Sequence, residues 1–238
     1  MVFFLFWNIL FKITLNKKFM NFHIITIFPE AFDSFIKTSI IWKWIKNNLF
    51  NIKLYKLNDF SDKNFKHVDD KAYWIHGQVI SPEPLSKAIN FVKNKINWKS
   101  IIIYMSPSWD LLNQEKVENH YTNFKNKDII IICGHYEWID QRIIDKYVDF
   151  EISIWEYILT SWELAATILI DSIVRNIPEV LWNKQSLEEE SFSKFFNRQK
   201  EHPVYTRPKV FEEMEVPKIL TSWNHKEIEK WKFNNLKE

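Results

Sequence analysis

Three polar turns that follow apolar runs hold the residues best suited to chemistry. They span residues 104–109 (YMSPSW), 133–140 (CGHYEWID) and 154–164 (IWEYILTSWEL). An open parallel sheet binds its ligand beyond the carboxyl ends of its strands. If the apolar runs are strands of such a sheet, the three turns lie together and could enclose one small molecule.

Several common kinds of active site are missing from the sequence. It has no glycine-rich phosphate loop, no Cys or His cluster with metal-ligand spacing, and no nucleophile elbow. These absences disfavour hydrolases and nucleotide-binding folds. Cys133 is the single Cys, which excludes an internal disulfide and suits a reducing cytoplasm. We expect it at the buried end of a strand.

The elements that must position these turns alternate along the chain. Ile-rich apolar runs bounded by polar turns predict buried strands at residues 23–28, 52–57, 101–105 and 129–133. Helical periodicity follows at residues 31–37, 85–96, 114–124, 140–147 and 163–177. This alternation predicts an α/β domain with a mainly parallel sheet.

The two ends of the chain differ from this central pattern. Residues 1–19 form an apolar run that lacks a basic leading region and is short for a membrane span, and Met20 opens a strand-like segment. We therefore expect Met20 to be the initiator, residues 1–19 to be an over-extended gene prediction, and the protein not to enter a membrane. Residues 183–203 are charged and weakly periodic, which predicts a flexible linker. Residues 204–238 predict a small helical subdomain, with an amphipathic helix from Asn224 onward.

The balance of Trp and Gly is unusual. The chain has 12 Trp and 2 Gly in 238 residues, whereas Gly is ordinarily about 7% of a protein. Many of these Trp stand among Ser, Asn, Asp and Glu, in turn settings that favour Gly. Our hypothesis is that most are glycines in the living protein, encoded by UGA codons decoded with the wrong genetic code. The alternative is a truly Trp-rich fold, and the codon at each position distinguishes the two.

Overall charge gives little information about partners. The net charge is +2, with 46% hydrophobic and 26% charged residues, values typical of a globular protein. Binding to RNA requires only a local cluster of Lys and Arg. Residues 43–46 and 194–200 are such Lys-rich segments, and each is either a phosphate contact or a solvated face.

A set of motifs carries a family resemblance from about Met20 to the end of the chain. In order they are FPEAF, VDDKAY, IYMSPS, ICGHYEWIDQR, SIWEYILTSWELAATILIDSIVR, EEESF and HPVYTRPKVFEEMEVPKILTSWNHKEIEKW. They closely resemble the bacterial tRNA (guanine-37-N1)-methyltransferases. Each suspect Trp in the central motifs stands where that family has Gly, which supports the decoding hypothesis. Trp231 is the exception, because the family has Trp there.

The resemblance implies a fold, a cofactor and partners. It implies an α/β domain of the SPOUT type with a deep trefoil knot on its C-terminal side, spanning residues 20–182, and a tRNA-binding domain at residues 204–238. It further implies S-adenosyl-L-methionine as cofactor, tRNA as substrate, a cytoplasmic homodimer and a Mg²⁺ requirement, although no metal-ligand motif is present. Family members commonly continue with further helix after the position of Trp231, so the tRNA-binding domain is expected to be shortened.

By motif match, the cofactor lies against the three turns and is held mainly by backbone groups. A Trp at 155 or 162 would place a large side chain in that pocket. The residues that the resemblance assigns to the cofactor are Tyr104, Met105, Ser106, Pro107, Ser108, Gly134, Tyr136, Glu137, Ile154, Trp155, Tyr157, Leu159, Ser161, Trp162 and Ala165.

Two residues carry the chemistry that the resemblance implies. Methylating N1 of guanine requires removal of a weakly acidic proton, which a carboxylate can accept while a cation near O6 stabilises the developing charge. The family uses an Asp in the linker and an Arg that ends the long helix. Arg175 matches the Arg, and Glu190 stands at the Asp position, one methylene longer.

Four residues are candidates for substrate contact. Asp70 resembles a substrate-side position, although a solvated turn Asp fits it equally well. His202, Tyr205 and Arg207 fit the tRNA-contacting domain, and Tyr205 fits equally as a packing residue. The segment 74–79 departs from the glycine-rich run of the family, which leaves substrate contacts there open.

The expected activity is therefore methylation of guanosine 37 in tRNA. Two alternatives stay open. One is a SPOUT methyltransferase with another target base. The other is a catalytically inactive RNA-binding homologue, suggested by Glu190 in place of Asp and by the altered segment 74–79.

Overall fold

The chain folds as two compact units that divide after Val180. The computed structural model describes residues 20–74, 76–96, 99–181 and 188–237. The proposed extension at residues 1–19 and part of the proposed linker lie outside these ranges. In the part of the chain that is described, no helix is both long and apolar enough to cross a membrane.

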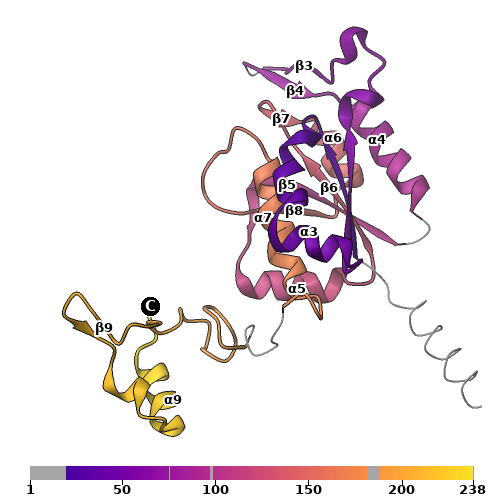
Figure 1. Ribbon diagram of the computed structural model, residues 1–238. Coiled ribbons are helices and arrows are strands. Elements are labelled where there is room, and N and C mark those ends of the chain that lie inside the picture. Colours follow the sequence, from indigo (N-terminus) through magenta and orange to yellow (C-terminus); the bar gives the residue numbers. More distant parts are fainter. Residues whose placement is uncertain (1–19, 75, 97–98, 182–187, 238) are drawn as a thin grey trace, which may run out of the picture. The chain divides into compact units, whose positions relative to one another are not determined.

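A five-stranded parallel sheet forms the centre of the first unit (Figure 1). Its order is β2-β1-β6-β5-β8, and every neighbouring pair is parallel. The strands are β1 (Met20–Thr26), β2 (Phe50–Lys56), β5 (Ser100–Leu111), β6 (Asp128–Cys133) and β8 (Phe150–Ser153). All six residues of β6 are buried, as expected for a central parallel strand covered on both faces. The prediction of an α/β fold with a mainly parallel sheet is confirmed, and the knot stays a prediction.

Helices cover both faces of this sheet (Figure 1). On one face, α4 (Pro82–Lys95) and α6 (Gln141–Tyr147) bury Leu85, Ile89 and Ile143 against strand residues such as Ile130. On the other face lie α3 (Ser39–Lys46), α5 (Gln114–Phe124) and α7 (Glu163–Val174), with the short α2 (Asp33–Lys37) before them. Alternate strand residues therefore point into two apolar layers, which hold the carboxyl edge of the sheet in place.

A second, smaller sheet stands beyond the carboxyl end of β6. It consists of β3 (Asp69–Lys71), β4 (Gln78–Ile80) and β7 (Trp138–Ile139), in the order β3-β4-β7. Strand β7 begins five residues after β6 ends, so the turn 134–137 connects the two sheets. This connection fixes the direction in which that turn leaves the main sheet.

The second unit is built on a small aromatic core. The ring of Phe196 is fully buried and lies 5.7 Å from that of Phe233, while His202 lies 5.7 Å from Trp231. Its elements are the hairpin of β9 (Val210–Phe211) and β10 (Met214–Glu215), and α9 (His225–Asn234). The side chain of Asn224 accepts a hydrogen bond from the backbone of Glu227 and so caps α9.

Two Trp residues occupy backbone that favours glycine. Trp74 has φ +67° and Trp223 has φ +59°, and both side chains are almost completely exposed. A left-handed conformation costs an L-residue about 1–2 kcal/mol, and an exposed indole gains no burial to offset that cost. Trp44 differs, because it is buried on α3. The backbone at 74 and 223 suits glycine, as it does at other described residues with positive φ such as Phe65, and the decoding hypothesis stays a prediction.

Candidate functional site

The three predicted turns lie at neighbouring strand ends of the main sheet. The turn 133–140 follows β6 and the turn 154–164 follows β8, whereas residues 104–109, expected as a turn after a strand, lie within β5, which stands between β6 and β8 in the order of strands. Residues Met105 and Asp110 of β5 both pair with Ile152 of β8, so the intervening residues 106–109 bulge out of the sheet. The backbone N–H of Leu112 donates to the carbonyl of Ser153 at 2.8 Å and closes this bulge. Ser106 is fully buried within it, whereas the side chain of Ser108 lies outside the described part.

Gly134 is the point at which the three turns meet. A Cβ atom built on Gly134 would lie 3.1 Å from the Tyr104 ring and hydroxyl and 3.5 Å from Cδ1 of Trp162. Burial raises the pKa of Tyr104 and keeps its hydroxyl neutral. A side chain at this position would push the Tyr104 side chain aside by a few tenths of an ångström, so glycine favours the close approach of these turns.

The turn before α7 exposes most of its apolar side chains. Trp155 is 58% exposed and Tyr157 is 49% exposed, and the Ser153 hydroxyl donates to the Trp155 carbonyl at 2.8 Å. Trp162 differs, because only 9% of it is exposed and its ring lies next to Gly134. Of the two Trp expected in the pocket, the structure therefore buries Trp162 between the turns and leaves Trp155 at the surface.

A buried hydrogen-bond chain joins the start of α7 to the main sheet. The Thr26 hydroxyl donates to Oε1 of Glu163 at 2.5 Å and accepts from the backbone N–H of Phe28 at 2.9 Å. Glu163 is 2% exposed. Burial of Cys133 raises the pKa of its thiol, and the nearby Glu163 carboxylate raises it further. The ends of β1 and β6 are thereby fixed relative to the turn that precedes α7.

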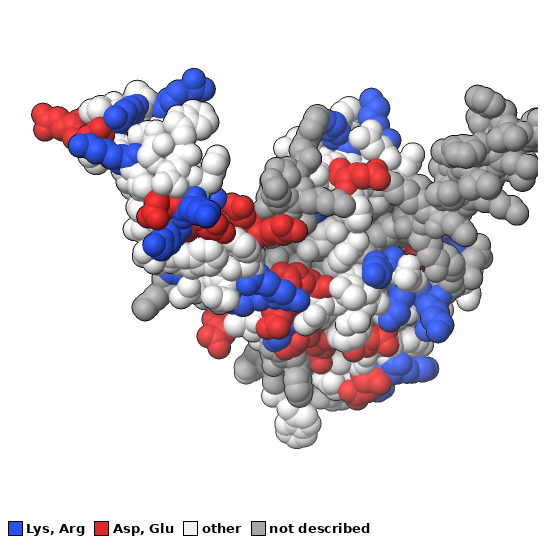
Figure 2. Space-filling view, turned by 90° about the horizontal axis from the view of Figure 1, so that it is seen from below, with Lys and Arg blue, Asp and Glu red and all other residues white. Residues whose placement is uncertain are grey.

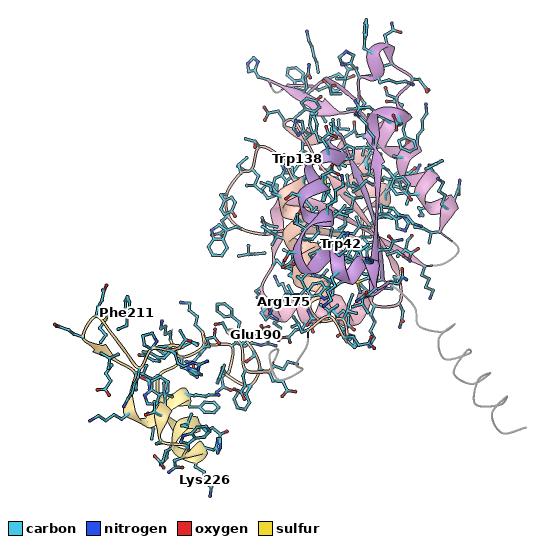
Figure 3. All side chains as sticks on the ribbon, in the orientation of Figure 1. Trp42, Trp138, Arg175, Glu190, Phe211 and Lys226 are labelled. Carbon is cyan, nitrogen blue, oxygen red and sulfur yellow. The ribbon has the colours of Figure 1, made fainter. Side chains whose placement is uncertain are left out.

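Arg175 lies at the C-terminal end of α7 (Figure 3). It borders a groove of about 490 Å³ between α7 and the turn that joins α2 to α3. Burial raises the pKa of Asp171 in this groove, while the positive charge of Arg175 acts in the opposite direction. The residues lining the groove are Phe35, Thr38, Ser39, Ile40, Ile41, Thr167, Ile168, Asp171, Ser172 and Arg175.

Glu190 belongs to the second unit and is half-buried. Its carbonyl accepts a hydrogen bond from the backbone of Ser193 at 3.1 Å. The neighbouring Glu189 forms an ion pair with Lys232 at 2.6 Å. Arg175 therefore lies in the first unit and Glu190 in the second.

The four substrate candidates have distinct surroundings. The Asp70 carboxylate lies 2.9 Å from Nζ of Lys63, and this hydrogen bond lowers the pKa of Asp70. In the second unit, His202 and Tyr205 both pack against Trp231, with ring centroids 5.7 and 6.3 Å away. Arg207 is exposed and precedes the cis peptide bond to Pro208. Tyr205 therefore packs on Trp231 while 46% of it stays exposed.

Charge is mixed on the surface of the second unit. On the face shown in Figure 2, its Lys and Arg residues are interspersed with Asp and Glu. Among the described residues, no group of three or more His, Cys, Asp or Glu side chains is arranged to hold a metal ion.

Sequence reasoning missed Thr26 and Phe28, which shape this edge of the sheet, and gave no separate role to Glu163 within the predicted turn 154–164. Thr26 and Phe28 stand in the segment TIFPE, and Glu163 stands in SWELAA. The only available signal was the presence of both segments among the family motifs. Their contact depends on the end of β1 meeting the start of α7, 137 residues later.

Comparison with known proteins gives a consistent result. A family model described as tRNA (Guanine-1)-methyltransferase TrmD matches residues 20–238. A tRNA (guanine-N(1)-)-methyltransferase of Buchnera aphidicola subsp. Schizaphis graminum is 47% identical over 222 residues, which cover 93% of this chain and 82% of that protein. The protein of the same name from Clostridioides difficile is 42% identical over 216 residues, 90% of each chain. The crystal structure of the tRNA (m1G37) methyltransferase from Aquifex aeolicus matches with a TM-score of 0.72 and 33% identity, covering 90% of this chain and 88% of that one.

Proposed function

Because the chain belongs to the tRNA (guanine-1)-methyltransferase family, we propose that it methylates N1 of guanosine 37 in tRNA with S-adenosylmethionine. The observation that carries the proposal is the meeting of three turns at Gly134, within a chain that matches the family model from residue 20 to residue 238. The Tyr104 and Trp162 side chains lie next to Gly134, where a Cβ atom would be 3.1 and 3.5 Å from them.

We propose that backbone groups of the three turns hold the cofactor. When bound, S-adenosylmethionine supplies the methyl group that is transferred. The residues proposed to hold it are the fifteen assigned by motif match, with Tyr104, Gly134 and Trp162 at their centre. Ala165 is fully buried in the first turn of α7 and keeps that helix close to the sheet.

In the proposed reaction, Glu190 accepts the proton from N1 of guanine and Arg175 stabilises the charge that develops at O6. As the proton leaves for the carboxylate, the N1 electron pair forms the new bond to the methyl carbon, and the bond between that carbon and the donor's sulfonium sulfur breaks to leave a neutral thioether. Arg175 remains protonated throughout, because a guanidinium does not lose its proton in proteins. Asp70, His202, Tyr205 and Arg207 are proposed to contact the tRNA.

The arrangement of the working enzyme is part of the proposal. Residues 20–182 form the cofactor-binding domain with its knot, residues 183–203 the linker, and residues 204–238 the tRNA-binding domain. Two exposed apolar side chains on α7 support a homodimer: Ile168, which lines the groove beside Arg175, and Leu164 in the first turn of the helix. Activity on tRNA supports a cytoplasmic location, and a Mg²⁺ requirement rests on the family alone.

Methyl transfer to paired tRNA transcripts tests the proposal. The protein should carry the residue that its source translates at each Trp position. We expect labelled methyl from S-adenosylmethionine to enter a transcript with guanosine 37 and not the same transcript with adenosine 37. Equal labelling of both would indicate another target base, and binding without transfer would indicate an inactive RNA-binding homologue.

A further inference from the structure

The Lys63 ammonium uses all of its hydrogen-bond donors within the protein. Nζ donates to the Asp69 carbonyl at 2.8 Å, to Oδ2 of Asp70 at 2.9 Å and to the Ser81 hydroxyl at 3.1 Å. An ammonium has three N–H groups, so these contacts occupy every donor. Asp69 and Asp70 belong to β3, and Ser81 directly follows β4. Lys63 is therefore anchored on two strands, whereas a lysine of a solvated face keeps its charged end in water.

The Asp70 carboxylate is held at both of its oxygens. Oδ2 accepts from Lys63, and Oδ1 accepts from the backbone N–H of Lys71 at 2.9 Å. The Asp70 side chain is nevertheless 74% exposed. A carboxylate has about four acceptor sites in all, so about two remain open to donors from outside the chain. Amino groups on base edges are donors of this kind.

Strand pairing connects Asp70 to the turn that follows β6. Asp70 pairs with Val79 of β4, and Val79 pairs with Trp138 of β7 in the small sheet (Figure 1). Trp138 lies within the turn 133–140, which is proposed to hold the cofactor. The place of Asp70 relative to that turn is therefore set by the sheet, and the direction of its carboxylate is set by Lys63.

Lys63 also changes the charge at this position. Nucleic acid carries one negative charge per phosphate, which an isolated carboxylate would repel. The ammonium 2.9 Å from Asp70 offsets the charge of that carboxylate. The same hydrogen bond lowers the pKa of Asp70 and keeps its oxygens ionised as acceptors. Lys63 therefore lets a carboxylate act as an acceptor beside an anionic partner.

We propose that Lys63 is a positioning residue for tRNA binding, which directs the Asp70 carboxylate toward donor groups of the tRNA and offsets its charge. This rests on the proposed function, in which Asp70 contacts the tRNA. Lys63 acts through Asp70 and does not itself touch the tRNA.

A double-mutant cycle on tRNA affinity tests this role in the full chain. Its members are the wild type, Lys63→Met, Asp70→Ala and the double variant, each measured by filter binding at several salt concentrations. Lys87→Met is the matched control, because Lys87 forms an ion pair with Asp62, next to Lys63. The side chains of that pair are 46% and 84% exposed, against 38% and 74% for Lys63 and Asp70. Calorimetry with S-adenosylmethionine and methyl transfer to guanosine 37 are measured separately.

We expect Lys63→Met to weaken tRNA binding about fivefold, the upper range for one exposed ion pair. Lys63→Arg should stay within about twofold of the wild type, because a guanidinium also donates to a carboxylate. Lys87→Met should change tRNA affinity less than about twofold. In the Asp70→Ala background, Lys63→Met should add less than about twofold, because its partner is already absent. Affinity for S-adenosylmethionine should stay within about twofold throughout.

Additive effects of Lys63→Met and Asp70→Ala would overturn the proposal. A salt slope reduced by about one in Lys63→Met would also overturn it, because that loss marks a lysine that contacts phosphate directly. An effect of Lys63→Met no larger than that of Lys87→Met would overturn it by leaving Lys63 as a support of the loop alone. If the wild type failed to methylate guanosine 37 while the cycle gave the expected result, the proposed function would be wrong and the role of Lys63 in tRNA binding would stand.

Discussion

Glu189 and Glu190 are adjacent carboxylates with different surroundings, and they allow a matched test of the proposed base. Glu189 is paired with Lys232 at 2.6 Å, whereas Glu190 stands at the position of the family Asp. We expect Glu190→Gln to lower kcat by about 10²- to 10⁴-fold, because an amide cannot accept the N1 proton. Glu189→Gln should change kcat less than threefold. Single-turnover methyl transfer with saturating tRNA measures both, and Glu190→Asp should retain activity. Equal effects of the two Gln variants would contradict the assignment.

At the opposite, amino-terminal edge of the main sheet, His23 links folding stability to pH. It is 2% exposed, Nδ1 lies 3.0 Å from the Tyr55 hydroxyl, and Nε2 lies 3.5 Å from the Asp128 carboxylate. Burial lowers the pKa of His23; the Asp128 carboxylate acts in the opposite direction without reversing it, and Lys53 adds to the lowering. The folded state therefore binds this proton less readily than the unfolded state.

The stability that depends on neutral His23 is fully present above pH 6.5, the ordinary pKa of a His side chain. It is lost as the pH falls from 6.5 toward the lower pKa that His23 has in the folded state. We expect urea denaturation to show decreasing stability from pH 7 to pH 5. The decrease should be smaller in His23→Gln, which has no proton to bind. The same pH dependence in wild type and variant would show that His23 has no part in it.

At the scale of elements, the start of α7 is the place where a Trp should obstruct function. Trp162 is the N-cap of α7, makes no side-chain capping hydrogen bond, and lies beside Gly134. Glycine is a better N-cap than a large apolar residue and would free the space between the turns. We expect Trp162→Gly to tighten S-adenosylmethionine binding at least tenfold by calorimetry.

Trp223→Gly is the matched control for that variant. Trp223 is 85% exposed in the second unit and has φ +59°, so glycine suits its backbone as well. This variant should leave cofactor affinity unchanged. The account of the pocket would be contradicted if the Trp-bearing chain already bound S-adenosylmethionine tightly and Trp162→Gly did not tighten that binding.

Elements with a strong local pattern could be predicted from the sequence. The predicted helix at 114–124 has the bounds of α5, and the predicted run 129–133 lies within β6. Helix α3 was missed, because it begins at Ser39 with φ +54° and its apolar face is interrupted by Lys43. Strand β8 was missed because it has four residues, one of them charged.

The candidate site was predictable only where one segment holds all of its parts. The turn at Gly134 is such a segment: its place after a strand was predicted and is confirmed, while the cofactor role of its residues stays a prediction. The ring contact between Phe28 and His135 joins residues that are brought together by the pairing of β1 with β6. Nothing in either segment alone indicates that pairing, so the contact required the structure.

At the scale of the whole molecule, the exposed apolar residues of α7 predict association of two chains. Leu164 is 62% exposed and Ile168 is 48% exposed, and an apolar interface would bury both. We expect light scattering to give twice the chain mass of 29.1 kDa. Ile168→Glu should give the single-chain mass and at least tenfold less methyl transfer, whereas Phe91→Glu should remain dimeric. A wild-type protein of single-chain mass with full activity would rule out the dimer as a requirement.

The identity of the methylated nucleoside tests the central claim most directly. Transfer RNA treated with the enzyme and S-adenosylmethionine is digested with a site-specific nuclease, and the fragments are analysed by mass spectrometry. The account predicts 1-methylguanosine at position 37 and unmodified guanosine elsewhere. Methylation at another position, at another atom of guanine, or on no nucleoside at all would contradict it.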